Sequence, residues 1–375
     1  MVTSAGKISE PRTRRCANKR LSGYPRVLAA QGRAIRASGQ RSHNYNYVNE
    51  VTQRTLAGGS PIIFQYDGNA GASNGNLKSD GTLIYSYDAL NRPIQINRVS
   101  DGLTIATYLY DAMDRRVRKT TLNGGLNGSV PNSTTDYIWS GSQVVEERNA
   151  GNTPIRQYLW GTYVDELIQL ITLVPLGPQS LPAGAYYLLQ DLLYRATALT
   201  SSTGVIVEAY DTDAYGNTLI FTGPGADGIW FTDDDVQSSY GANEIIYCGY
   251  RFDPESELYY VRNRTYSPVL GRWIQRDPIG YAGGINLYEY AGGRAVIAVD
   301  PTGDVSCHKH ALVCLHGCDS LRKIADIIVQ VIKERCVQDC RGALATGRLL
   351  RGLPGASRVA RRACPDGVGG VLYWM

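Results

Sequence analysis

Two short motifs in the last third of the chain combine a carboxylate with turn-forming residues. They are Asp277-Pro278-Ile279-Gly280 and Asp300-Pro301-Thr302-Gly303. Asp before Pro, with Gly three positions after Asp, is typical of β-turns in which a side-chain oxygen caps backbone amides. A carboxylate is also a common general acid or base. The motifs therefore allow two interpretations, a pair of structural turns or a pair of catalytic acids.

A second group of potentially reactive residues follows Gly303. It comprises Cys307, His308, His310, Cys314, His316, Cys318, Cys336, Cys340 and Cys364. Apolar residues at helical spacing predict a helix over 321–335, and a second antiparallel helix over 305–317 would bring the start of this group to its end. Cys307, His310, Cys336 and Cys340 would then form a tetrahedral set suited to Zn²⁺. Disulfides and free thiols are the alternatives, and we expect no other cofactor.

The residues before these motifs predict an all-β body. The chain has 26 Tyr and 41 Gly, which favour strands and turns respectively. Tyr-Asp pairs recur at Tyr66-Asp67, Tyr87-Asp88 and Tyr110-Asp111, and again at Tyr210-Asp211. Each pair is close to a run that alternates with period two, so each unit is a β-hairpin. We expect the Tyr side chains to pack inward and the Asp side chains to bind turn amides.

Charge divides the chain into three parts. Residues 1–44 carry ten Lys or Arg and one acid, residues 45–304 carry 17 basic and 28 acidic residues, and residues 305–375 carry 11 basic and five acidic residues. We interpret residues 1–44 as a basic, disordered arm, and we do not expect nucleic acid as a partner. No signal peptide is visible, and no run of 18 apolar residues predicts a membrane span.

The run from Gly249 to Gly303 closely resembles the Rhs-repeat-associated core of bacterial Rhs and YD-repeat proteins. The Tyr-Asp units resemble YD repeats, including those of teneurin-like shells and of the C components of insecticidal toxin complexes. The resemblance implies a YD-repeat hairpin region over 45–245 and a core over 246–304, followed by a variable Cys-rich tail over 305–375. The implied fold is an all-β spiral of hairpins, a partial shell closed by the core, with a small α-helical tail.

The same resemblance implies a self-cleavage site. In the family, the acid of the first motif, the preceding Arg and the acid of the second motif lie near the cleaved bond. The matching residues are Asp277, Arg276 and Asp300, and the cut would follow residue 304. Two neighbouring carboxylates share a proton and can act together as acid and base. This chain departs from the family at Asp304, where Leu is usual, and at Arg294-Ala295, where Asn-Pro is usual.

The resemblance implies a carrier that encloses or presents its own C-terminal tail, as a toxin cargo in many such systems. Its expected partners are an upstream Rhs shell, secretion-system proteins and an immunity protein, and its expected location is secreted or at the cell surface. Two alternatives stay open: a YD-repeat protein that binds carbohydrate or a partner cell without any enzymatic activity, and a truncated, inactive remnant of a larger Rhs protein.

Overall fold

The structure is a computed structural model that describes residues 41–56, 59–68, 74–177, 179–304 and 307–308. Its first strand begins at Arg41, inside the segment expected to be a basic arm. The helix predicted over 321–335 lies outside the described residues, as do Cys336, Cys340 and His310. Within the described part, strands and turns dominate and the only helices are two short 3-10 turns, so the all-β prediction is confirmed.

The first eighteen strands follow one another along residues 41–237. They are β1 (Arg41–Tyr45), β2 (Val51–Leu56), β3 (Ile62–Ile63), β4 (Gln65–Tyr66), β5 (Leu77–Ser79), β6 (Leu83–Tyr87), β7 (Pro93–Arg98), β8 (Thr104–Tyr110), β9 (Arg116–Thr121), β10 (Ser133–Ser140), β11 (Gln143–Asn149), β12 (Pro154–Trp160), β13 (Leu167–Thr172), β14 (Gly184–Gln190), β15 (Ala196–Ser201), β16 (Ile206–Thr212), β17 (Thr218–Gly223) and β18 (Val236–Gln237).

The later elements are shorter. They are β19 (Arg251–Asp253), β20 (Leu258–Val261), β21 (Arg264–Ser267), β22 (Arg272–Trp273), the 3-10 helices η1 (Gly280–Ala282) and η2 (Ala291–Gly293), β23 (Ala298–Val299) and β24 (Cys307–His308).

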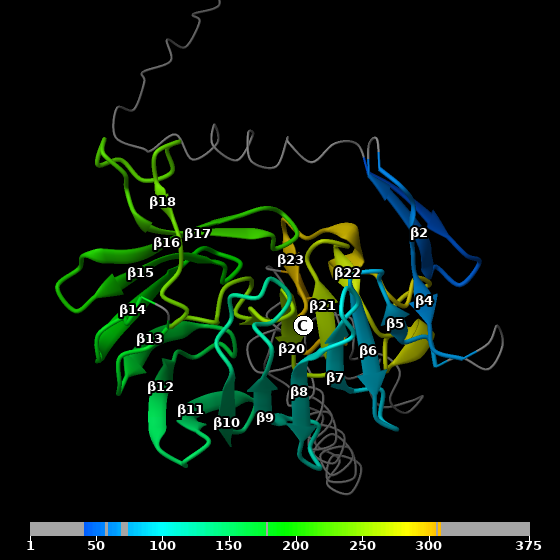
Figure 1. Cartoon of the computed structure of the whole chain (residues 1–375), viewed down its shortest axis with the longest axis horizontal. Helices are drawn as coiled ribbons and strands as arrows, with labels where there is room; N and C mark the ends of the chain where they lie inside the picture. The colour runs from blue at the N-terminus through cyan, green and yellow to red at the C-terminus, as the bar shows by residue number, and fades with distance from the viewer. Residues whose placement is uncertain (1–40, 57–58, 69–73, 178, 305–306, 309–375) are drawn as a thin grey trace, which may run out of the picture.

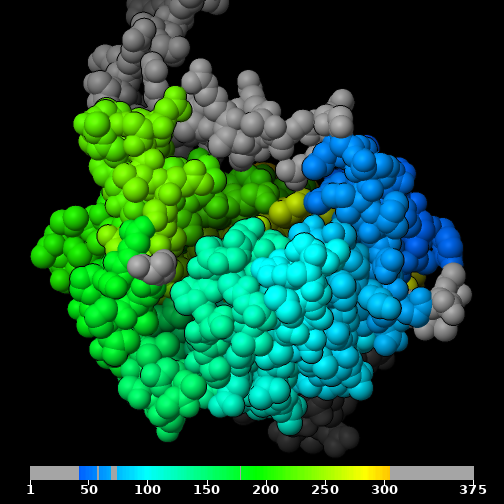
Figure 2. Space-filling view, in the orientation of Figure 1, coloured from blue at the N-terminus to red at the C-terminus, as the bar shows by residue number. Residues whose placement is uncertain are grey.

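Strands β4 to β18 form one antiparallel sheet in sequence order, which we call the wall. The wall bends into an arc around a smaller unit, the core segment 244–304, which contains the four-stranded sheet β19–β22 (Figure 1). From the side shown in Figure 2, the wall covers most of the core segment. The wall keeps two separate edges, at β4 and β18, so the described strands make an open partial shell.

The turns of the wall repeat one hydrogen-bonding pattern. Asp88 Oδ1 accepts the backbone N–H groups of Leu90 and Arg92 at 2.9 and 3.0 Å, and its Oδ2 accepts Arg92 Nε at 2.7 Å. Asp111 binds its turn in the same way. The predicted role of these Asp residues is therefore confirmed. After the Tyr210-Asp211 pair, the turn amides of Tyr215 and Asn217 donate to Asp213 Oδ1, two residues beyond the pair.

Aromatic residues at the ends of wall strands connect each strand to the one before it. The hydroxyls of Tyr87 and Tyr110 donate to the carbonyls of Leu77 and Pro93 at 2.7 and 2.9 Å. Trp139 Nε1 donates in the same way to the carbonyl of Arg116 at 2.9 Å. These bonds satisfy polar atoms at the half-buried end of each hairpin, where an unpaired donor would destabilise the fold.

The core segment is held to the wall by a cluster of buried ion pairs. Arg116 of β9 makes a two-pronged pair with Asp253 of β19, at 2.6 and 2.8 Å. Lys119 lies 3.2–3.4 Å from acids of the core segment, and Arg251 Nη1 lies 2.6 Å from Glu147 of β11. Beside this cluster, the core contains mutually packed aromatic rings: Tyr247, Tyr250, Tyr259, Tyr266, Trp273 and Tyr290.

We find no helix in the described part of the chain with the length and hydropathy needed to cross a membrane.

Candidate active site around Arg264

Arg264 opens strand β21 and is almost completely buried. Arg264 follows directly after a tight β20–β21 turn at Arg262 and Asn263. Its guanidinium carbon lies 4.3 Å from the centre of the Trp273 ring. A cation over the face of an indole ring is attracted to it, and Arg makes this contact more often than Lys. The contact therefore helps to hold the Arg264 guanidinium in place.

Arg264 bridges the two Asp-Pro-x-Gly motifs. Its Nη2 lies 3.1 Å from Asp277 Oδ2 and 3.3 Å from Asp300 Oδ2. Its Nε donates to the carbonyl oxygen of Gly303. One side chain therefore contacts both carboxylates and the backbone next to the expected cleavage position. The structure brings together Asp277 and Asp300, which the sequence analysis placed in one site.

Each of the two acids also binds its own turn. Asp277 Oδ1 accepts the backbone N–H of Ile279 at 3.0 Å. Asp300 Oδ1 accepts the N–H groups of Gly303 and Asp304 at 3.0 and 3.1 Å. In both residues one carboxylate oxygen accepts hydrogen bonds from backbone N–H groups of the turn, and the other lies within 3.3 Å of Arg264 Nη2. The two interpretations of the motifs, turn formation and acid–base chemistry, are therefore compatible in the same side chains.

Burial changes the acidity of this group. Desolvation raises the pKa of Asp300 to about 6, and the positive charge of Arg264 opposes this rise. Burial also raises the pKa of Asp277, against the same opposing charge. The pKa of Arg264 is lowered by its own burial. Near neutral pH the site therefore contains a carboxyl group that can both hold and release a proton.

The loop 300–304 lies closely against the β20–β21 turn. Gly303 has φ +79°, and a Cβ at this position would come within 2.8 Å of the carbonyl oxygen of Val261. Arg262 Nη1 donates to the carbonyl oxygen of Pro301. After the loop the chain turns back, and Val299 of β23 pairs with Cys307 of β24. The backbone around position 304 is thus held on both sides.

Arg276, which the family resemblance implied for this site, contacts Glu50 and Tyr288. Its Nη2 is 2.9 Å from Glu50 Oε1 and its Nε is 3.2 Å from the hydroxyl of Tyr288. These contacts connect the start of the first motif to the segment before β2. The position between the carboxylates belongs to Arg264, which the sequence analysis did not select. The sequence signal for Arg264 is weak, because it is a cation in a short strand whose four residues are all buried.

The predicted zinc set falls almost entirely outside the described residues. Cys307 is described only through its backbone pairing in β24. Among the residues that the structure does describe, no three His, Cys, Asp or Glu side chains converge as metal ligands. The one Cys with a described side chain, Cys248, is buried, and burial raises the pKa of its thiol to about 12.

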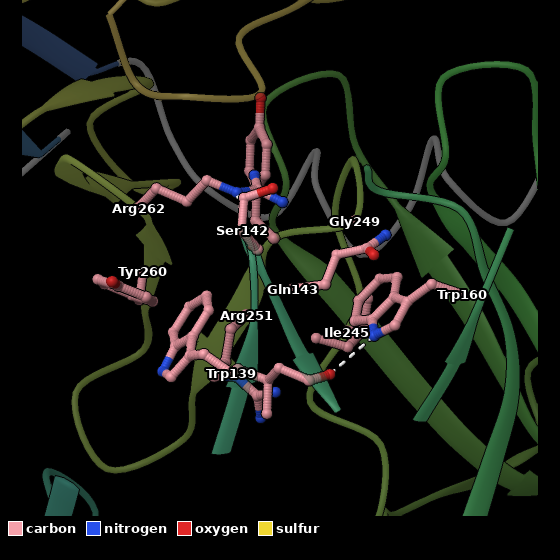
Figure 3. A pocket seen from close by; sticks show the side chains of 11 residues that line it. Trp139, Ser142, Gln143, Trp160, Ile245, Gly249, Arg251, Tyr260 and Arg262 are labelled. Atoms are coloured by element: carbon pink, nitrogen blue, oxygen red, sulfur yellow. Dashed lines mark hydrogen bonds between the residues drawn. The ribbon is translucent and has the colours of Figure 1, made fainter. Parts of the chain in front are cut away.

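A small pocket lies where the wall meets the core segment (Figure 3). Trp139 and Trp160 of the wall line it together with Arg251 and Arg262 of the core segment. Its volume of about 40 Å³ has room for a few water molecules and is far below the size of a cofactor site. Arg262, which lines this pocket, also donates a hydrogen bond to the carbonyl oxygen of Pro301.

Comparisons with known proteins find relatives among bacterial toxins. The tRNA3(Ser)-specific nuclease WapA of Bacillus spizizenii is 28% identical over 236 residues, 61% of this chain and 9% of the nuclease. Toxin protein Tse5 of Pseudomonas aeruginosa is 29% identical over 236 residues, 60% of this chain and 18% of Tse5. No family model matches the chain.

Among solved structures, the crystal structure of TcdB2-TccC3-TEV aligns with a TM-score of 0.48 at 17% identity, over 70% of this chain and 13% of that one. The chain spans only 9–18% of the length of the two curated relatives. Over 236 residues, the chain is therefore similar to a segment of each of these two bacterial proteins.

Proposed function

We propose that this chain is the shell-and-core part of an Rhs-type carrier, that its cargo is its own tail over 305–375, and that it cuts itself after residue 304. The observation that carries the proposal is the position of Arg264, which contacts Asp277, Asp300 and the Gly303 carbonyl at once. The similarity to WapA and Tse5 supports a role in toxin delivery.

In the proposed reaction, water attacks the carbonyl carbon of residue 304. Ionised Asp277, the less buried of the two acids, accepts a proton from that water. Neutral Asp300 donates a proton to the amine of Val305 as the C–N bond breaks. The charge of Arg264 stabilises the developing oxyanion, and its bond to Gly303 fixes the loop. Arg276 acts indirectly, by anchoring the start of the Asp277 turn to Glu50.

The test is intact-mass analysis of the purified full chain under denaturing conditions, beside an Asp277→Asn variant. We expect the wild type to give two fragments that divide near residue 304, and we expect the variant to stay intact. Asp111→Asn is the matched control, because Asp111 also binds a turn and an Arg but lies in the wall. An intact wild-type chain at every pH between 4.5 and 8 would refute self-cleavage.

The partners are part of the same proposal. Among the described strands, the wall ends at β4 and β18, which have no further partner in that sheet, and such edges readily pair with further strands. An upstream Rhs shell would extend the wall at the β4 edge, which is the edge nearer the N-terminus. A secretion system would export the assembly from the cell, and an immunity protein would neutralise the tail.

A further inference from the structure

Asp304 occupies an unusual place for a carboxylate. Its Oδ2 accepts a hydrogen bond from Asn263 Nδ2, and its backbone N–H donates to Asp300 Oδ1 at 3.1 Å. Its Oδ1 is buried and has no hydrogen-bond partner among the described residues. A buried, ionised carboxylate needs hydrogen bonds or a counterion on both oxygens. A neutral carboxyl group fits this position much better.

The charges that face Asp304 come from three elements. Arg264 of β21 faces it, as do Asp277 from the turn after β22 and Asp300 from the start of its own loop. The neighbouring Arg262 also contacts the loop, but its guanidinium pairs with the buried Asp165 at 2.9 Å. Within the described part of the chain, the guanidinium of Arg264 therefore faces three carboxyl groups. Ionising all three would leave an excess of negative charge in a buried site, which is unfavourable.

We propose that Asp304 is a positioning residue that seats the loop 300–304 against Arg264 only in its neutral form, so that acid permits cleavage. This inference rests on the self-cleavage proposed above. When Asp304 ionises, its buried oxygen favours a position in water, and the loop leaves the site. The bond after residue 304 then moves away from Asp277 and Asp300, and the reaction stops.

The pKa of Asp304 indicates that the loop is released as the pH approaches neutrality. Burial raises its pKa to about 6, the Asn263 hydrogen bond and Arg264 oppose the rise, and Asp300 and Asp277 add to it. A carboxyl group with a raised pKa stabilises the folded state below its unfolded pKa of about 4. That contribution is lost as the pH rises through about 6. The seated loop is therefore the acid form of the site.

The first readout of the test is the rate of cleavage of the full-length wild type, Asp304→Asn and Asp304→Leu at pH 5 and pH 7.5. The neutral fraction of a group falls tenfold for each pH unit above its pKa. We therefore expect the rate ratio of Asp304→Asn to wild type to rise by at least about tenfold between the two pH values, with Asp304→Leu behaving similarly. Asp300 titrates in every variant and does not produce this ratio by itself. A constant ratio overturns the inference while leaving self-cleavage intact.

The second readout does not depend on cleavage. We expect Asp304→Asn to raise the melting temperature relative to wild type at pH 7.5 and to have a smaller effect at pH 5. The control is Asp136→Asn, which removes a charge from a surface pair with Arg118. If no protein cleaves but the pH-dependent stabilisation is present, the proposal that neutral Asp304 holds the loop against Arg264 is supported and the self-cleavage proposal fails. Equal melting-temperature shifts at both pH values would contradict the proposal that Asp304 holds the loop only in its neutral form.

Discussion

At the scale of single residues, the candidate site depends on one guanidinium, that of Arg264, which forms ion pairs with two carboxylates. Arg264 reaches Asp277 and Asp300 from a single nitrogen and the Gly303 carbonyl from another. The planar fork of Arg can bind several acceptors in fixed directions, whereas Lys presents a compact point charge. Charge alone is therefore not sufficient for the geometry that the proposed reaction needs.

Arg264→Lys tests this requirement for geometry. The variant keeps the positive charge near the two acids but loses the fork, so we expect cleavage to slow by about 100-fold, a typical loss for one transition-state donor. The measurement is the half-time of cleavage by intact mass. Arg118→Lys, on the exposed face of β9, serves as control. A half-time within about threefold of wild type would exclude a geometric role for Arg264.

At the scale of elements, the wall is built from hairpins that depend on a turn Asp. Asp111 accepts hydrogen bonds from Met113 N, Arg115 N and Arg115 Nε. Asp191 makes the same set of contacts in the β14–β15 turn, although no Tyr precedes it. Three positions after each Asp, the turn has a residue with positive φ, Asp114 (φ 62°) and Tyr194 (φ 60°). The structural unit is therefore the Asp with this left-handed residue, and the preceding Tyr is not essential.

Asp111→Ala is expected to lower the free energy of unfolding by about 1–2 kcal/mol, since two backbone donors and one Arg lose their acceptor. Urea unfolding followed by fluorescence measures the change. Asp136→Ala removes a carboxylate from a more exposed cross-strand pair with Arg118 and is expected to change stability by less than about 1 kcal/mol. Similar losses in both variants would argue against a special role for the turn.

Alternation and turn residues were sufficient to predict the hairpins, because both are local properties of the chain. The pairing of Asp277 with Asp300 was implied by family resemblance, and in the structure both acids lie within 3.3 Å of Arg264 Nη2. Arg264 was not predictable in this way, because its contacts depend on the registers of β21 and β22 and on the path of a later loop. Arg276 was also implied by the family resemblance, but its guanidinium contacts Glu50 and Tyr288.

At the scale of the whole molecule, wall and core are joined by buried charges from distant parts of the chain. Arg116 and Asp253 are both nearly inaccessible to solvent and are separated by 137 residues. A single sequence gives no sign of such a pair, since either residue alone resembles an ordinary surface charge. Breaking a buried pair leaves an uncompensated charge, which is strongly destabilising.

Arg116→Met is expected to lower the free energy of unfolding by about 3–5 kcal/mol, because Asp253 would remain buried beside fewer cations. Arg118→Met is the matched control, two residues along the same strand but in an exposed pair, and is expected to change stability by less than about 1 kcal/mol. The double variant Arg116→Met with Asp253→Leu is expected to recover part of the loss. Chemical unfolding of the four proteins measures these differences, and equal effects of the two single variants would contradict a buried clamp.

The β23–β24 pairing spans the proposed cleavage position. Val299 and Ala298 lie before that position, and their partners Cys307 and His308 lie after it. A break in the covalent chain at residue 304 therefore leaves the two fragments joined by strand pairing. Breaking the chain and dissociating the product are thus separate events. A nicked protein would migrate as one particle on a native column and as two bands after denaturation, and the lifetime of that nicked complex would set when the tail becomes free.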